Sequence, residues 1–165
     1  MSEDAAKKSI LNANEIQKKM GSLLTKNEAT SHALAILESQ RHCLVATNAE
    51  DGYPNIKTMS NRKHEGLKTI WFKTDTFSMR VQQLMKDNRA CVYLLDAKLG
   101  RGLMLVGLMD VIADVDIKRL IWIKGEEKYN PLGVDDPGWC VLRFTAKRAN
   151  VVDAMQNKGL TFEIE

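Results

Sequence analysis

Apolar residues near the start of the chain recur at helical spacing. Over residues 2–24 they alternate with Lys and Glu in a pattern typical of an amphipathic helix. A second helix is predicted over residues 29–40, with Thr30 or Ser31 as its N-cap. We interpret both helices as structural elements, because neither carries a recognisable catalytic or ligand-binding motif.

After residue 41 the pattern changes to short apolar segments that are rich in strand-forming residues and bounded by turn residues. The pair Asp51 and Gly52 is typical of a hairpin turn, and Pro54 opens the strand that follows. Gly107, inside a long apolar segment, predicts a bulge or a close approach between two backbones. The predicted strands are 43–47, 54–61, 67–74, 89–97, 103–114 and 139–151, with 160–164 as a candidate closing strand.

Few helices interrupt these strands. Helices are predicted over 75–88 and 116–124, and a turn over 62–66. Because consecutive strands are joined by short, hairpin-like turns, the pattern favours an antiparallel barrel or sandwich over a doubly wound parallel sheet. We therefore predict a mainly β domain over residues 29–165, preceded by a helical extension over residues 1–28.

The composition is that of one globular domain. The chain has 165 residues, of which 44% are hydrophobic and 27% charged. Its longest uncharged apolar run, residues 103–109, is far shorter than the roughly 20 residues that a membrane-spanning helix needs. The N-terminus has no apolar stretch like that of a secretory signal. Cys43, Cys91 and Cys140 are odd in number and far apart, so we predict reduced thiols in a cytoplasmic protein, without disulfides or a metal site.

Positive charge is concentrated in the middle of the chain. The formal net charge is +3, but residues 57–101 carry ten Lys or Arg and four Asp or Glu. The remainder is slightly acidic, with 14 bases and 17 acids. Such an excess indicates an anionic partner or, alternatively, a set of solvated strand and helix faces. Nucleic acid is not expected as the partner, because the Lys and Arg residues do not form runs. In addition, only 6% of residues are aromatic, which is too few for extensive stacking on nucleobases.

The residues best suited to bind an anion lie between positions 53 and 80. Lys57 lies on one predicted strand, Thr74 ends another, and Ser78 and Arg80 begin the helix that follows. A helix N-terminus presents free backbone N–H groups, to which Ser78 adds a hydroxyl and Arg80 a guanidinium. If the two strands are neighbours, Lys57 converges on the same point. This set predicts a pocket for a phosphate monoester; the alternative is that Ser78 merely caps the helix and the bases are solvated.

Other familiar catalytic signatures are missing from the sequence. It has no P-loop, no GxGxxG after a strand, no CxxC and no HExxH. His32, His42 and His64 are scattered and do not have metal-ligand spacing. We therefore expect neither a metal site nor an acid–base pair.

The segments YPNIKTM, IWFKTDTFSMR, ACVYLL and RGLMLVGLMDVIAD follow one another in this order. Over residues 31–145 their order and spacing resemble the FMN-binding split-barrel family, which includes proteins related to pyridoxamine 5'-phosphate oxidase and the general stress flavoproteins of bacteria. The stretch EKYNPLGVDDPGWCVLRFTAKRAN also resembles a C-terminal element of a bacterial branch of this family. The resemblance implies a mainly β fold, a six-stranded antiparallel split barrel with peripheral helices.

The resemblance also implies FMN as the cofactor. Ser78 and Arg80 would contact the FMN phosphate, and Lys57 would precede the strand segment that lines the isoalloxazine ring. The family's aromatic-x-Thr-x-x-x-Ser-x-Lys/Arg element matches residues 72–80. The implied cofactor-binding residues are Lys57, Thr58, Met59, Ser60, Phe72, Lys73, Thr74, Ser78, Met79 and Arg80.

Two departures separate the chain from the oxidases of this family. The oxidases have two adjacent basic residues at the phosphate, where this chain has Met79 and Arg80. They also end in a signature with Arg, Trp and His residues, where this chain ends in NKGLTFEIE. The resemblance therefore implies a related flavoprotein and does not extend to pyridoxamine 5'-phosphate oxidase activity itself.

The implied activity is transfer of a hydride or electron from NADH or NADPH through FMN to an unidentified acceptor. The resemblance further implies a homodimer with cofactor sites at its interface, which would also cover the apolar strand over 103–109. Trp122, Tyr129 and Trp139 are candidates for substrate contact or, alternatively, for core or interface packing. The alternative function is a non-catalytic flavin- or ligand-binding carrier or stress-associated sensor.

Overall fold

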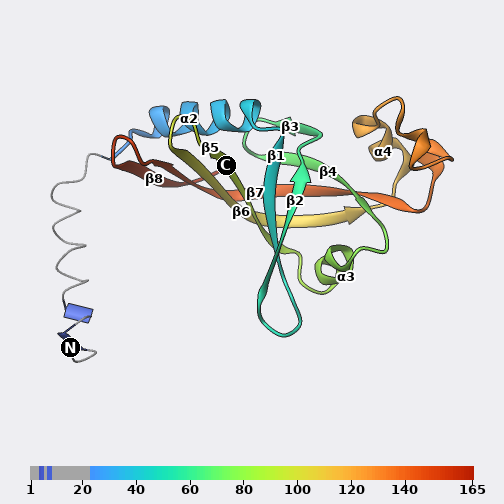
Figure 1. The fold of residues 1–165 in the computed structure, drawn as a ribbon, viewed down its shortest axis with the longest axis horizontal. Coiled ribbons are helices and arrows are strands. Elements are labelled where there is room, and N and C mark those ends of the chain that lie inside the picture. Colours follow the sequence, from blue (N-terminus) through green and yellow to red (C-terminus); the bar gives the residue numbers. More distant parts are fainter. Residues whose placement is uncertain (1–3, 6, 9–22) are drawn as a thin grey trace.

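Antiparallel strands are the main secondary structure of the chain (Figure 1). The computed structural model describes residues 4, 5, 7, 8 and 23–165, so most of the helix expected over 2–24 lies outside the described residues. Within the described part, eight strands form a single sheet, and three peripheral α-helices accompany it. The prediction of a mainly β antiparallel fold is confirmed.

The elements follow the predicted order, with small shifts at their ends. The helices are α2 (Lys26–Ser39), α3 (Met79–Lys86) and α4 (Val115–Ile121), and the short 3-10 helices are η1 (Glu126–Lys128) and η2 (Gly133–Asp135). The strands are β1 (His42–Asn48), β2 (Pro54–Ser60), β3 (Lys63–Glu65), β4 (Thr69–Asp75), β5 (Arg89–Asp96), β6 (Arg101–Ile112), β7 (Trp139–Asp153) and β8 (Lys158–Glu163).

The strand count is eight, where the sequence predicted six and a candidate closing strand. The expected turn over 62–66 is wrong, because Lys63–Glu65 pairs with β4 as the short strand β3. Three residues are too few to show the alternation by which strands are identified in a sequence. The candidate closing strand is confirmed as β8, which pairs with the end of β7.

The strand order explains how distant segments meet. It runs β2-β1-β5-β6-β7-β4-β3, with β8 also paired to β7. β7 pairs with β6 along one edge, and with first β4 and then β8 along the other. β2 and β4 are therefore not hydrogen-bonded neighbours. The sequence analysis had left open whether these two strands are adjacent. The curled sheet nevertheless brings β2 and β4 close to each other (Figure 1).

One face of the curled sheet forms the main core together with α2 and α3. Ile36 and Leu37 of α2 are fully buried against sheet residues such as Phe72, Leu105 and Phe144. Burial of apolar surface on this scale supplies the dominant stabilising free energy of a domain, at about 25 cal/mol per Å². This core fixes the relative positions of β1, β4 and α3.

α2 begins earlier than expected because its N-cap is Thr25, not Thr30 or Ser31. The Thr25 backbone N–H donates to Glu28 Oε2 at 2.8 Å, and the Glu28 N–H donates to Thr25 Oγ1 at 3.2 Å. These reciprocal bonds form a capping box.

No helix among the described residues has the length and apolar character needed to span a bilayer.

The opposite face of the sheet is covered over one half. A second, smaller core of Trp71, Ile121, Trp139 and Val141 joins α4 to β4 and β7. The segment from α4 to β7 therefore covers β4 and the first half of β7 on this side.

The other half of this face, over β1, β2, β5 and β6, is open. It exposes the apolar side chains of Leu44, Ile56, Tyr93 and Leu95. The apolar strand over 103–109 does not present all its side chains there, because alternate residues point into the chain's own core.

Candidate functional site

The N-terminus of α3 brings three of the predicted site residues together. Ser78 is the N-cap, and its Oγ accepts the Val81 backbone N–H at 3.4 Å. Arg80 Nη1 donates to Thr74 Oγ1 at 2.6 Å, and Thr74 Oγ1 lies 3.4 Å from Ser78 Oγ. Thr74, Ser78 and Arg80 therefore form one compact set of hydrogen-bonding groups.

Local structure positions this set. Thr74 lies on β4, in register with Cys140 of the neighbouring β7. A tight turn follows, in which the Ser78 N–H donates to the Asp75 carbonyl oxygen at 3.1 Å, and α3 begins at Met79. The first N–H groups of a helix have no partner within the helix and carry partial positive charge. The three side chains thus stand where an anion would be favoured.

The Arg80 cation is half-buried. Burial lowers the pKa of its guanidinium, while the nearby Asp75 carboxylate opposes that change. An arginine with a lowered pKa still remains charged at neutral pH, because its ordinary pKa is above about 12. A partly desolvated cation attracts an anion more strongly than a fully solvated one.

The Cys140 thiol lies beside this set, but it is not suited to act as a nucleophile. The side chain is buried, and burial raises the pKa of the thiol. Burial likewise raises the pKa of Cys43, to about 12. Both thiols are therefore protonated at neutral pH. All three cysteines are free, as the prediction of reduced thiols requires.

The predicted segment 57–60 lies on β2, at one end of the strand order. Lys57 and Met59 are in register with Val45 and Cys43, so their side chains share the core-facing side of the sheet. Met59 is buried and Lys57 is exposed. Thr58 and Ser60 alternate to the opposite face. Since β2 pairs with β1 along one edge, alternate backbone groups on its other edge are left unpaired by the sheet.

Phe72, Lys73 and Met79 do not join the three hydrogen-bonding side chains. Phe72 is fully buried in the main core. Lys73 points to the other face of β4, where its Nζ donates to Glu126 Oε2 at 3.0 Å. Met79 is largely exposed, and its Sδ lies 3.2 Å from Asn55 Nδ2. The structure thus converges on Thr74, Ser78 and Arg80, with Lys57 exposed on the approaching strand.

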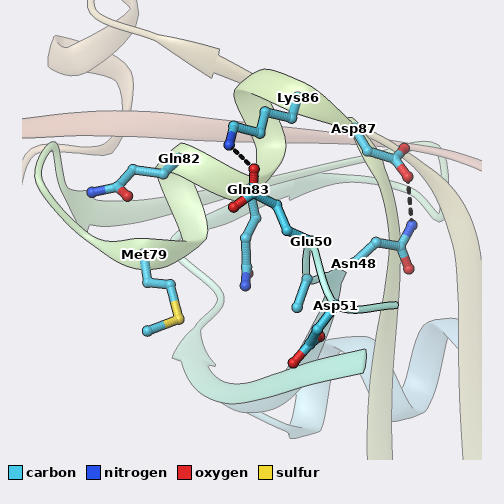
Figure 2. Close-up of a pocket in the computed structure, with 9 residues that line it drawn as sticks. Asn48, Glu50, Asp51, Met79, Gln82, Gln83, Lys86 and Asp87 are labelled. Carbon is cyan, nitrogen blue, oxygen red and sulfur yellow. Dashed lines mark hydrogen bonds and ion pairs between the residues drawn. The ribbon is translucent and has the colours of Figure 1, made fainter. Parts of the chain in front are cut away.

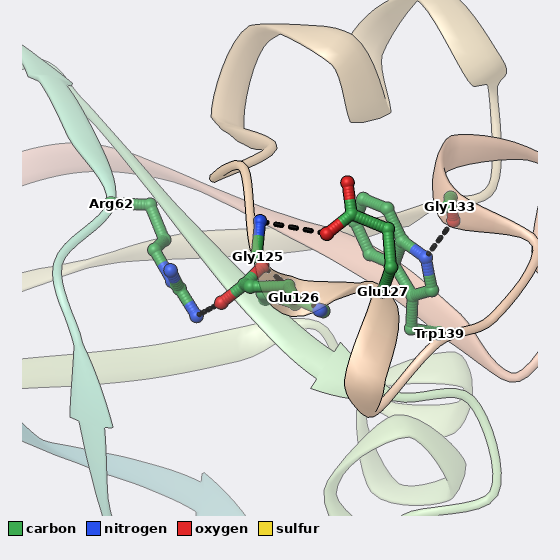
Figure 3. Close-up of polar contacts among 7 residues, drawn as sticks. Arg62, Gly125, Glu126, Glu127, Gly133 and Trp139 are labelled. Carbon is green, nitrogen blue, oxygen red and sulfur yellow. Dashed lines mark hydrogen bonds and ion pairs between the residues drawn. The ribbon is translucent and has the colours of Figure 1, made fainter.

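Sequence inspection missed the charge cluster that engages Lys73. Glu126 of η1 pairs with Arg62 at 2.6 Å (Figure 3). It also pairs with Lys73 at 3.0 Å, and all three side chains are less than one-fifth exposed. Burial opposes ionisation of Glu126, but hydrogen bonds from Lys73 and Arg62 outweigh it, so the pKa of this carboxyl is lowered. No local sequence signal links Glu126 to residues more than 50 positions away. The cluster anchors η1 to β4.

The three aromatic candidates have different surroundings. Trp139 is fully buried, and its Nε1 donates to the Gly133 carbonyl oxygen at 2.8 Å (Figure 3). The Trp122 ring stacks on it, with centroids 5.5 Å apart. Lys73 Nζ lies 4.8 and 4.9 Å from the two ring centroids. Trp139 is therefore part of the core, Trp122 is half-buried against it, and Tyr129 is 71% exposed.

A pocket of about 440 Å³ lies between α3 and the connection from β1 to β2. Residues 48–51 line one side, and Met79, Gln82, Gln83 and Lys86 line the other (Figure 2). Gln83 was not among the predicted site residues. The i, i+4 spacing of Met79 and Gln83 places them on one helix face, which is the signal that would have identified Gln83.

The arrangement at the start of α3 is built for binding. Its side chains supply a guanidinium and two hydroxyls, the groups that recognise phosphate oxygens. Among the residues that the structure describes, no imidazole or carboxylate is hydrogen-bonded to Thr74, Ser78 or Arg80 through their side chains. The chemistry of these three side chains is therefore suited to binding an anionic group, and none of the three is itself a redox group.

The family model of pyridoxamine 5'-phosphate oxidase-like proteins matches residues 28–164. The chain is 40% identical to a Clostridium acetobutylicum protein of the pyridoxinephosphate oxidase family, related to general stress protein 26 of Bacillus subtilis. The match has a TM-score of 0.75 and covers 85% of this chain and 97% of that chain.

Two more distant structures share the fold. A pyridoxamine 5'-phosphate oxidase-related, FMN-binding protein from Nostoc punctiforme is 18% identical, with a TM-score of 0.59 over 87% of this chain and 99% of that chain. A heme-binding protein from Mycobacterium smegmatis is 14% identical, with a TM-score of 0.68 over 85% and 60% of the two chains. No curated protein matches the chain.

Proposed function

The chain belongs to the pyridoxamine 5'-phosphate oxidase-like family, and we propose that it is an FMN-binding flavoprotein that acts as an oxidoreductase. The observation that carries this proposal is the convergence of Thr74, Ser78 and Arg80 at the N-terminus of α3. The Nostoc punctiforme protein of the same fold is described as FMN-binding. These two observations support FMN as the ligand.

The donor set fits a phosphate monoester. The Arg80 guanidinium has more N–H groups than its bond to Thr74 uses, so it retains donors for phosphate oxygens. The Ser78 hydroxyl and the first N–H groups of α3 add further donors. Lys57, exposed on β2, supplies a second positive charge for a dianion. Together they would hold the phosphate end of FMN.

The exposed edge of β2 fits the flavin ring. Its unpaired backbone groups supply hydrogen-bond donors and acceptors along Thr58, Met59 and Ser60. A ring placed along this edge would lie close to β4, because the curled sheet brings the two strands together. In this proposal β2 orients the ring while α3 holds the phosphate.

Bound FMN would supply hydride and electron transfer, with NADH or NADPH as the proposed reductant. The protein residues bind the two ends of the cofactor and fix its orientation. Backbone donors along a ring edge also stabilise negative charge on that edge.

A homodimer is supported by the open apolar face over β1, β2, β5 and β6. Leu44, Ile56 and Leu95 are each between 44% and 54% exposed there. Apolar side chains gathered on one sheet face are a common sign of a protein interface. A two-fold partner seated on this face would lie next to β2 and so complete the cofactor site.

The proposal is tested on the purified protein in two steps. A flavin absorption spectrum, with FMN identified in the released cofactor, is the expected result. A colourless protein that does not bind added FMN would refute it. The Mycobacterium smegmatis relative makes a heme spectrum the informative alternative.

The second step separates an enzyme from a carrier. The FMN-loaded protein is mixed anaerobically with NADH or NADPH, and bleaching of the flavin absorbance is followed. Rapid bleaching is the expected result. Stable, tightly bound FMN that neither nucleotide reduces would favour the non-catalytic carrier or sensor and contradict the proposed oxidoreductase.

A further inference from the structure

Gln83 joins α3 to both strands of the β1–β2 hairpin. Its side chain is 8% exposed, although it carries a polar amide. Gln83 Oε1 accepts two hydrogen bonds: one from Thr47 Oγ1 of β1 at 2.7 Å and one from Asn55 Nδ2 of β2 at 3.3 Å. Thr47 and Asn55 are themselves register partners across the hairpin. One buried oxygen therefore links three elements.

The link lies next to the proposed phosphate site. Asn55 Nδ2 also lies 3.2 Å from the sulfur of Met79, the first residue of α3. Met79 stands between Ser78 and Arg80 in the sequence. Lys57 follows Asn55 by two residues, so both side chains point to the same face of β2. Gln83 thus ties α3 to Asn55, which lies on β2 two residues before the segment 57–60.

The contact is costly to disturb. A buried polar group that loses its partner retains its desolvation penalty, so Thr47 and Asn55 depend on Gln83 as much as Gln83 depends on them. Figure 2 shows Gln83 on the face of α3 that lines the pocket toward the β1–β2 connection. Its amide is thereby held at a fixed distance from both strands.

We infer that Gln83 is a positioning residue that sets the spacing between the phosphate-binding start of α3 and the flavin-binding edge of β2. This inference rests on the proposed function, in which one FMN molecule is held at both places. A ligand held at two points gains affinity when the two sites stand at the correct separation. Gln83 would act through Ser78, Arg80 and β2 without touching FMN.

Riboflavin provides the probe, because it has the same ring as FMN and lacks the phosphate. The ratio of the riboflavin Kd to the FMN Kd measures the affinity that the phosphate group contributes. Substitution of a residue that only stabilises the fold lowers the melting temperature and leaves this ratio unchanged. Substitution of a residue that positions the two subsites changes the ratio of the two Kd values.

The experiment compares Gln83→Leu with Gln82→Leu, its exposed neighbour on α3, by titrating both flavins and recording melting temperatures. We expect Gln83→Leu to lower the Kd ratio at least about fivefold while the riboflavin Kd changes less than about threefold. Gln82→Leu should leave the ratio within about twofold of wild type. Thr47→Val removes one donor to Gln83 and should shift the ratio in the same direction by a smaller factor.

Equal weakening of both flavins by Gln83→Leu, or an unchanged ratio, would overturn the inference. If Gln83→Leu does not fold, Thr47→Val decides, and a wild-type ratio in that variant would be the contrary result. A wild-type protein that binds neither flavin refutes the proposed function and this inference together. If the wild type prefers FMN and Gln83→Leu retains that preference, only the role of Gln83 is refuted, and the proposed function stands.

Discussion

Gly107 shows how closely β6 and β7 approach. A Cβ atom at this position would stand 2.1 Å from the Thr145 carbonyl oxygen and 2.9 Å from the Ala146 Cα. The register between β6 and β7 also shifts between Val106 and Gly107, which confirms the predicted bulge. A side chain here would have to push apart the backbones of the two longest strands.

Gly107→Ala should therefore lower the free energy of unfolding by about 3 kcal/mol, the upper range for overpacking a core. Urea unfolding followed by circular dichroism measures this loss. Gly52→Ala is the control, because Gly52 has a φ of +83° but no atom within 4 Å of an added Cβ. That variant should lose about 1 kcal/mol from backbone conformation alone. Equal losses in both variants would contradict the close approach at Gly107.

At the scale of elements, Glu126 anchors the segment between α4 and β7. Its carboxylate bridges Arg62, which precedes β3, and Lys73 of β4. The lowered pKa means that the ionised form is favoured in the folded protein. Ionised Glu126 therefore stabilises the fold above the ordinary carboxyl pKa, and this contribution is lost as pH falls through the lowered folded-state pKa.

Glu126→Gln should lower the free energy of unfolding by about 2 kcal/mol at neutral pH, because two charged donors lose an ionised acceptor. The difference from wild type should shrink as the pH of urea unfolding is lowered toward about 3. Glu127→Gln provides a matched control, since Glu127 is exposed and accepts the Gly125 N–H. A difference for Glu126→Gln that is constant with pH would contradict the assigned ion pairs.

The sequence predicted those elements and residues whose determinants are local. Thr74, Ser78 and Arg80 lie within seven consecutive positions, so the end of a strand and the start of a helix suffice to bring them together. The contacts of Gln83 and Glu126 could not be predicted in this way, because their partners are 28 or more positions away in the sequence and only tertiary packing brings them together. β3 was missed for another reason: it pairs with the next strand along the chain, but its three residues are too few to show an alternating pattern.

At the scale of the molecule, the sheet is covered unevenly. The main core and the α4 segment bury one face and half of the other. Leu44, Tyr93 and Leu95 remain exposed on the open half, over strands that include the proposed ring-binding strand β2. In the proposed homodimer this open face would be covered by the partner, and each cofactor site would depend on assembly.

Leu44→Glu should therefore shift the protein from dimer to monomer, because a charge at the centre of an apolar interface is costly to desolvate. Light scattering after size-exclusion chromatography measures the mass, and FMN affinity should fall with it. Leu132→Glu, at an exposed leucine that directly precedes η2, should change neither property. A wild-type protein that is monomeric and binds FMN fully would contradict the shared site.

The central claim is that the start of α3 holds the phosphate of FMN, and an FMN titration of Arg80→Ala tests it most directly. The variant should bind FMN at least tenfold more weakly than wild type, a loss of about 1.4 kcal/mol. Arg119→Ala, which removes an exposed arginine paired with Asp116 on α4, should retain wild-type affinity. An Arg80→Ala protein that binds FMN as tightly as wild type would place the phosphate elsewhere and contradict the account.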